Sequence, residues 1–381
     1  MTVGHVLESR EASPFKTIRQ HLASRGQDIN GWWGDIGPLF ARMLQVGQYS
    51  VHEQYRHLLF LSETVIPALG PYPNRYHSAL TALGWPVEYS LNFHQDGPPR
   101  VRIALEPIDD RSGTPADPFN HLPSAELVSA VARMNLPAFD TTLYHHFAKD
   151  FILPTADAAR LGGVGLFRIQ RALGFDLRGS DIAPKGYAFM RLPHMATKTP
   201  TRELILQSIG SMRGQVKSNW MAGLTVVDEY IVSAGGYSEY TFLAWDFVSP
   251  ALSRLKLYGM HLQVTLAKAE EVWTVGGRFN DPGTRTGWGL FQRLWNLLGI
   301  NPRETAISNS KEDDDTPASD YQAPLLWNYE IQPGSAHPIP KLYLCVHGLN
   351  DLAVALGLAK FFASVGWVDS AKSYVDDLAS M

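Results

Sequence analysis

Short segments in which cationic or phenolic residues alternate with apolar ones recur along this chain, and they constrain its fold more than any other feature. In the clearest of them, residues 253–259, Arg254, Lys256 and Tyr258 alternate with leucines. Successive side chains of a β-strand point to opposite faces of the sheet. The three polar side chains would therefore share one face, and the leucines would pack on the other. A single segment of this kind would fit a solvated edge strand equally well.

The pattern recurs, and the recurrence favours a shared polar interior over a series of exposed edges. Three further pairs have the spacing of one strand face: Arg100 and Arg102, Lys185 and Tyr187, and Lys341 and Tyr343. A sheet closed into a barrel, with these side chains in its lumen and helices packed outside, accommodates every segment at once. A lumen lined with Arg, Lys and Tyr suits a polyphosphate attached to a group that ionises to a carbocation.

The composition is that of a globular protein with a large core. Of the 381 residues, 45% are hydrophobic and 18% are charged, and the formal net charge is −4. These values argue against disorder and give no reason to expect a nucleic-acid partner. Cys345 is the only cysteine, which indicates a reducing compartment. The N-terminus lacks the features of a signal peptide, and no apolar run approaches the ~20 residues of a membrane span. We therefore expect a cytoplasmic protein without a membrane partner.

Hydrophobic periodicity and turn residues predict that pairs of helices alternate with pairs of strands. Strand pairs are expected over residues 86–94 and 100–107, 164–177 and 184–192, 238–248 and 253–263, and 325–332 and 341–347. Helix pairs are expected over residues 32–46 and 51–68, 124–135 and 140–152, 201–213 and 223–233, 265–275 and 286–299, and 350–365 and 368–379. Strands joined by short turns pair antiparallel. The predicted fold class is α+β, an antiparallel barrel with a polar lumen inside a ring of helices. Residues 30–381 would form this single domain, after an N-terminal extension of residues 1–29.

Glu88 would lie on the lumen face of the first predicted strand, together with Ser90 and Asn92. A carboxylate inside a barrel is costly unless it is paired or hydrogen-bonded. Two interpretations are open. Glu88 forms a salt bridge with Arg100 or Arg102 on the neighbouring strand, or it accepts a hydrogen bond from an N–H group of a substrate.

Several short segments together carry a family resemblance. They include VEYSLNF at residues 87–93, VRIALEP at 101–107, APKGY at 183–187, RLKLY at 254–258 and PKLY at 340–343. In these segments, and over about residues 30–380, the chain resembles the dimethylallyltryptophan synthase family. These are fungal aromatic, mostly indole, prenyltransferases with the ABBA barrel. The chain looks most similar to the members that act on cyclic dipeptides.

The resemblance implies an enzyme of secondary metabolism that uses no metal ion or other cofactor. It would transfer a dimethylallyl group from dimethylallyl diphosphate to an indole acceptor, either a tryptophan-containing cyclic dipeptide or a related indole alkaloid. Its partners would be these small molecules, and a homodimer is compatible with the family.

The resemblance also implies roles for individual residues, and the physics agrees with them. The cations that would bind the diphosphate are Arg102, Lys185, Arg254, Lys256 and Lys341, with Arg100 as a further candidate. Tyr187, Tyr258 and Tyr343 would shield the allyl cation, and Glu88 would bind the indole N–H. Guanidinium groups bind phosphate oxygens in pairs. An aromatic face attracts a cation by roughly 0.5–2 kcal/mol.

The chain departs from the family pattern at two places. Family members continue into one more strand pair, rich in Tyr and Ser, whereas this chain stops at Met381. We therefore expect about eight strands in place of ten, and either a truncated sequence or a barrel with an open side. In members that prenylate C4 of tryptophan, a lysine precedes the position of Lys185. Here Ala172 stands at that place beside Arg171, which disfavours free tryptophan as the acceptor.

Other functions remain as alternatives to this interpretation. The acceptor could be free tryptophan or another aromatic compound, such as tyrosine or a phenol. A non-catalytic barrel that carries an anionic prenyl ligand is the rival from another class, but stacked cations and phenols favour the enzyme. The acidic run 312–315 consists of consecutive residues, not the spaced carboxylates of a Mg²⁺–diphosphate site, and we interpret it as a solvated loop. No metal site is predicted.

Overall fold

The computed structural model describes residues 13–95, 97–154, 157, 161, 168–212, 215–234, 240–302, 324–346 and 348–381. The acidic run 312–315 and the beginning of the strand predicted over 164–177 lie outside these ranges. Within them, no helix is both long enough and apolar enough to cross a bilayer.

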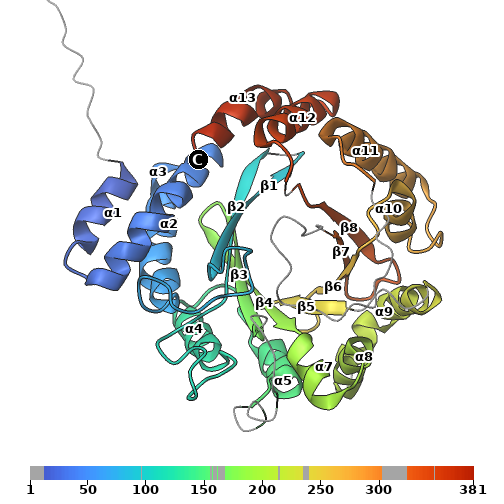
Figure 1. Cartoon of the computed structure of the whole chain (residues 1–381), viewed down its shortest axis with the longest axis horizontal. Coiled ribbons are helices and arrows are strands. Elements are labelled where there is room, and N and C mark those ends of the chain that lie inside the picture. Colours follow the sequence, from blue (N-terminus) through green and yellow to red (C-terminus); the bar gives the residue numbers. More distant parts are fainter. Residues whose placement is uncertain are drawn as a thin grey trace, which may run out of the picture.

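Eight strands form one sheet in which every neighbouring pair is antiparallel and the strand order follows the chain. The strands are β1 (Val87–His94), β2 (Gly97–Leu105), β3 (Arg171–Arg178), β4 (Asp181–Phe189), β5 (Tyr240–Asp246), β6 (Leu255–His261), β7 (Leu325–Ile331) and β8 (Ile339–Leu344). The sheet curls around a central lumen, and the helices form a ring outside it (Figure 1). The predicted α+β architecture is confirmed.

The helices surround the sheet in chain order. They are α1 (Pro14–Leu22), α2 (Gln27–Val46), α3 (Val51–Phe60) with the short turns η1 (Leu61–Val65) and η2 (Ile66–Ala68), α4 (Leu122–Arg133), α5 (Thr142–Phe151), α7 (Arg191–Thr197), α8 (Thr201–Ser211), α9 (Gln215–Ser233), α10 (Leu266–Trp273), α11 (Pro282–Leu298), α12 (Asp351–Ser364) and α13 (Val368–Ala379). Ile18 and Leu22 of α1 are buried in the main core. The division of the chain at residue 30 stays a prediction.

Two predicted boundaries around the second strand pair are wrong. The strand expected over 184–192 begins at Asp181 and ends at Phe189, and the helix α7, which was not predicted, follows at once. Pro193 lies in the first turn of α7, where a residue without an N–H group is tolerated. The strand expected over 164–177 is β3, which begins only at Arg171.

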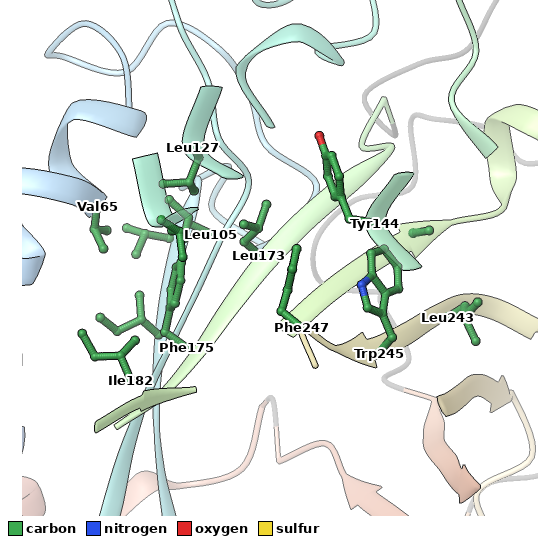
Figure 2. Packing of buried hydrophobic residues seen from close by; sticks show 14 of the residues in the cluster. Val65, Leu105, Leu127, Tyr144, Leu173, Phe175, Ile182, Leu243, Trp245 and Phe247 are labelled. Carbon is green, nitrogen blue, oxygen red and sulfur yellow. The ribbon is translucent and has the colours of Figure 1, made fainter. Parts of the chain in front are cut away.

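The core fills the space between the outer face of the sheet and the helices. Apolar side chains on alternate positions of β2 and β3 point outward, among them Leu105, Leu173 and Phe175, and they pack on the side of the helices (Figure 2). The ring of Phe175 meets Phe60 of α3 edge to face, with centroids 4.9 Å apart. Because strand side chains alternate, burying this apolar face against the helices directs the polar residues of the same strands into the lumen.

The strands β1 and β8 are the two edges of the described sheet, since the strand order runs from one to the other without closing. The helices α12 and α13 lie across this side of the barrel (Figure 1). Phe93 of β1 contacts Phe362 of α12 and Tyr374 of α13, with ring centroids 5.0 and 5.6 Å apart. Covering an edge with a helix is one way in which proteins prevent unwanted strand pairing.

Candidate active site

The lumen contains a pocket of about 280 Å³ in which the predicted cations meet. Its lining includes all six of them: Arg100, Arg102, Lys185, Arg254, Lys256 and Lys341. They come from the even-numbered strands β2, β4, β6 and β8, with Arg254 immediately before β6. Residues up to about 240 positions apart in sequence are thereby brought to one place.

The odd-numbered strands contribute carboxylates to the same region. Asp176 of β3 and Glu330 of β7 line the pocket, and Asp246 of β5 bonds to one of its arginines. Because odd and even strands are neighbours in the sheet, each carboxylate lies between two strands that carry cations. Sequence reasoning missed these acids, although Asp176 alternates with Phe175 and Leu177 as the cations alternate with their apolar neighbours.

Asp176 is the centre of the first group of charges. Its carboxylate lies 2.6 Å from the ammonium of Lys185, 3.1 Å from Nε of Arg102 and 3.7 Å from the guanidinium of Arg178. Burial alone would raise the pKa of Asp176, but Lys185 and Arg102 hold the pKa of this carboxyl below its ordinary value. Asp176 is therefore ionised and fixes the positions of the cations around it. Arg178, which also lines the pocket, was not predicted.

Glu330 and Asp246 organise the second group. Asp246 accepts two hydrogen bonds from Arg254, at 2.7 and 2.9 Å, in the paired geometry that suits a guanidinium. Glu330 lies 3.2 Å from Arg254 and 3.1 Å from Lys256. The hydrogen bonds to Asp246 raise the pKa of Arg254 above its ordinary value. Arg254 thus links β5 and β7 through Asp246 and Glu330, and these contacts fix its position in the pocket.

Among the described residues, neither Lys341 nor Arg100 has a carboxylate within ion-pair distance. The Nζ atom of Lys341 lies 5.4 Å from the ring centroid of Tyr343. Burial, together with Arg102 and Lys256, lowers its pKa to about 8. Burial also lowers the pKa of Lys185 to about 8, although Asp176 opposes the shift. The positive charges of the pocket repel one another, so an anion that binds there would relieve this repulsion.

The three predicted tyrosines form a layer next to the cations, because each follows a cation by two positions on its strand. The ring centroids of Tyr187 and Tyr258 are 6.5 Å apart, and those of Tyr258 and Tyr343 are 6.4 Å apart. Asn328 donates a hydrogen bond of 2.6 Å to the phenol oxygen of Tyr343. Burial raises the pKa of all three phenols, so they are neutral.

Two phenylalanines extend this layer and were not predicted. Phe242 of β5 stacks on Tyr258 with ring centroids 4.1 Å apart, and Phe189 of β4 lies 5.0 Å from Phe242. Phe189 is two positions beyond Tyr187 and continues the alternation of β4, so the sequence did contain a signal for it. The lumen is therefore cationic at one level and aromatic at the next.

Glu88 lies on the lumen side of β1, in register with Ala104 of β2. Within the described ranges no hydrogen bond or ion pair to its carboxylate is found, and Arg102 pairs with Asp176 instead. The predicted alternative, a salt bridge from Glu88 to Arg100 or Arg102, is thus not formed. Burial raises the pKa of Glu88, although its side chain remains reachable by water. We attribute the raised pKa and the exposed side chain to the position of Glu88, which is enclosed by the barrel wall but open to the lumen.

A larger cleft of about 760 Å³ lies outside the barrel, between α2, the β1–β2 hairpin and α13. None of the predicted site residues lines it. Among the residues that the structure describes, no group of three or more His, Cys, Asp or Glu side chains is arranged to hold a metal ion. The predicted cations thus gather in the smaller pocket and not in the larger cleft.

Almost the whole chain is similar to several known proteins. A family model described as tryptophan dimethylallyltransferase matches residues 28–377. Echinulin prenyltransferase 1 of Aspergillus ruber is 42% identical over 95% of this chain and 87% of its own length. Reverse prenyltransferase criA of Aspergillus cristatus is 40% identical over 96% of this chain and 86% of its own length. The crystal structure of NotF in complex with brevianamide F and DMSPP aligns with a TM-score of 0.86 at 36% identity, over 97% of this chain and 89% of that one.

Proposed function

The chain belongs to the tryptophan dimethylallyltransferase family and is an indole prenyltransferase, and from this premise we propose its substrates and its mechanism. The donor is dimethylallyl diphosphate, and the acceptor is the indole ring of a tryptophan-containing cyclic dipeptide. The acceptor follows from NotF, which is similar over almost the whole chain and binds brevianamide F, a compound of this class, together with DMSPP.

The observation that carries the proposal is the layering of the lumen. A pocket of about 280 Å³ with cations on four strands lies directly next to a layer of three tyrosines. A diphosphate needs the first environment, and an allyl cation needs the second. A barrel that only carried a prenyl ligand would have a mostly apolar lumen, so the stacked cations and phenols favour the enzyme.

The first step is the heterolysis of the donor. The bond between the allyl carbon and the diphosphate oxygen breaks, and its electron pair remains on the diphosphate. Arg102, Lys185 and Lys256 are already oriented by Asp176 and Glu330, so they stabilise the developing charge without reorganising. Each charge-assisted contact that forms in such a site contributes roughly 1.5–3 kcal/mol.

The tyrosine layer would protect the cation that this step creates. The faces of Tyr187, Tyr258 and Tyr343 can each stabilise it by roughly 0.5–2 kcal/mol. The stacked ring of Phe242, 4.1 Å from Tyr258, closes the layer and excludes water that would otherwise trap the cation as an alcohol. The phenols stay neutral because burial raises their pKa.

The acceptor reacts in the second step. Glu88, which has no protein partner in the described part of the lumen, accepts a hydrogen bond from the indole N–H. The ionised carboxylate pushes electron density into the ring, a ring carbon attacks the allyl cation, and a carbon–carbon bond forms. A base, such as the released diphosphate, then takes the proton from the alkylated ring carbon, and the electron pair of that C–H bond restores the aromaticity of the ring.

We propose that no metal ion is required, because the cations of the pocket supply the positive charge that Mg²⁺ supplies to other diphosphate sites. A cytoplasmic location and a homodimer also stay predictions.

Incubation with dimethylallyl diphosphate and a panel of acceptors tests the proposed function. The panel contains brevianamide F, other tryptophan-containing cyclic dipeptides, free tryptophan, tyrosine and a simple phenol. We expect a product heavier by one isoprene unit from at least one cyclic dipeptide, identified by mass spectrometry and located by NMR. Turnover of free tryptophan or tyrosine alone would refute the acceptor assignment. Binding of the donor without turnover of any acceptor would favour the carrier.

A further inference from the structure

We infer that Tyr49, which lies outside the lumen, is a positioning residue for the diphosphate pocket. The inference rests on the proposed function. Tyr49 follows α2 in the short connection to α3 and is 7% exposed. Its phenol oxygen donates a hydrogen bond of 2.7 Å to the carbonyl of Leu177 on β3 and accepts one of 3.1 Å from the N–H of Val101 on β2. The phenol thus bridges two strands of the barrel wall.

The bridge lies where the pairing of β2 with β3 stops. The register of these strands runs from Leu105 opposite Leu173 to Arg102 opposite Asp176. The next pair in this register would be Val101 and Leu177, and these are the two residues that the phenol joins. A buried backbone N–H and carbonyl need partners. The phenol is the hydrogen-bond partner of both groups. It holds the two strands farther apart than a direct hydrogen bond between their backbones would.

The spacing at this level determines the geometry of the pocket. The neighbours of Val101 along β2 are Arg100 and Arg102, and those of Leu177 along β3 are Asp176 and Arg178. All four line the cationic pocket. The distance of 3.1 Å between Asp176 of β3 and Arg102 of β2 therefore depends on how far apart Tyr49 holds the two strands. Its phenol is also within electrostatic range of Arg100 and Asp176, which both influence its pKa.

The local structure holds Tyr49 in this position. A Cβ atom on Gly47 would lie 2.7 Å from the ring of Tyr49 and 2.8 Å from the carbonyl oxygen of Pro99, so only glycine leaves room for the ring against β2. Ser50 is the N-cap of α3 and forms a capping box with Glu53. His57 of α3 meets the Tyr49 ring edge to face, and its Nε2 lies 2.6 Å from the carbonyl of Gly179 in the β3–β4 turn.

The phenol is a dependable bridge because it stays protonated. Burial raises the pKa of Tyr49 above its ordinary value, so the group can both donate and accept throughout the pH range in which the enzyme would work. Through Leu177 and Val101, the corner between α2 and α3 thereby connects the outer ring of helices to the two strands that carry Asp176 and Arg102.

Tyr49→Phe removes the bridge and keeps the ring, and Tyr55→Phe is the matched control. Tyr55 is also on this side of the molecule, but its phenol bonds to Thr17 on α1, at 3.2 Å, and to no other described residue. The readouts are the Kd of DMSPP by calorimetry, the KM of donor and acceptor separately, and Tm. We expect Tyr49→Phe to weaken DMSPP binding and raise the donor KM by about tenfold. The acceptor KM should change less than about twofold, and Tyr55→Phe should leave every constant unchanged.

Two results would overturn the inference. In one, Tyr49→Phe lowers Tm but the folded protein binds DMSPP as tightly as the unaltered chain, which would mean that the bridge only stabilises the fold. In the other, the donor and acceptor constants change together. Gly47→Ala, which would push the ring away from β2, should reproduce the selective loss of donor affinity. If the unaltered chain itself failed to bind DMSPP, the proposed function would fall and the inference with it.

Discussion

Glu88→Gln is the substitution that best separates acceptor activation from donor binding. It retains the shape of the side chain and an acceptor oxygen but removes the negative charge. No described residue pairs with the Glu88 carboxylate, and Arg102 is held by Asp176 at 3.1 Å. The substitution therefore leaves the cations of the diphosphate pocket with their present partners.

The magnitude of the effect follows from the hydrogen bond that is lost. A bond to a charged group is worth roughly 1.5–3 kcal/mol, and a neutral one roughly 0.5–1.5 kcal/mol. The difference of about 1–2 kcal/mol corresponds to about a five- to thirtyfold slower prenyl transfer. Stability should not fall, because burial raises the pKa of Glu88 and the ionised form is therefore the one that folding disfavours. Removing the charge should leave Tm unchanged or slightly higher at neutral pH.

The assay measures kcat and KM for the acceptor, the Kd of DMSPP and Tm on one preparation of each protein. Glu270→Gln, which changes an exposed carboxylate of α10, serves as the control and should match the unaltered enzyme. We expect Glu88→Gln to lower kcat/KM for the acceptor while the Kd of DMSPP changes less than about twofold. A donor affinity that falls as much as turnover does would place Glu88 on the diphosphate side and refute the reasoning.

Three further predictions concern the cationic pocket. Lys256→Ala should slow turnover about ten- to a hundredfold, because it removes one charge-assisted contact; the exposed Lys372→Ala on α13 is its control, and equal rates in the two variants would show that Lys256 does not contact the diphosphate. Turnover should persist in excess EDTA, whereas loss of activity that only Mg²⁺ restores would contradict a metal-independent site. Binding of DMSPP should weaken as pH rises through about 8, which is the pKa of Lys185 and Lys341, because the neutral amines no longer attract the anion. A Kd that is the same at about pH 6 and at about pH 10 would exclude these lysines from the site.

The sequence by itself determined which face of each strand is polar. Alternation in a β-strand is a local property, so Arg254, Lys256 and Tyr258 could be assigned to one face without knowledge of any neighbour. The short turns between paired strands predicted the antiparallel sheet. Outer helices were expected because the apolar face of each strand must be buried. The family resemblance then assigned roles to these residues, and those roles stay predictions.

The tertiary structure decided which groups meet, because cross-strand neighbours depend on register and on residues far apart in the chain. A salt bridge from Glu88 to Arg100 or Arg102 was one of two interpretations left open by the sequence, but the register of β2 with β3 places Arg102 beside Asp176. Only the pairing of neighbouring strands in the sheet sets carboxylates of the odd strands between cations of the even ones. Tyr49 had no visible role in the sequence, since its partners Val101 and Leu177 lie 52 and 128 residues away. Its contribution arises where two strands separate, and strand separation is a property of the folded sheet alone.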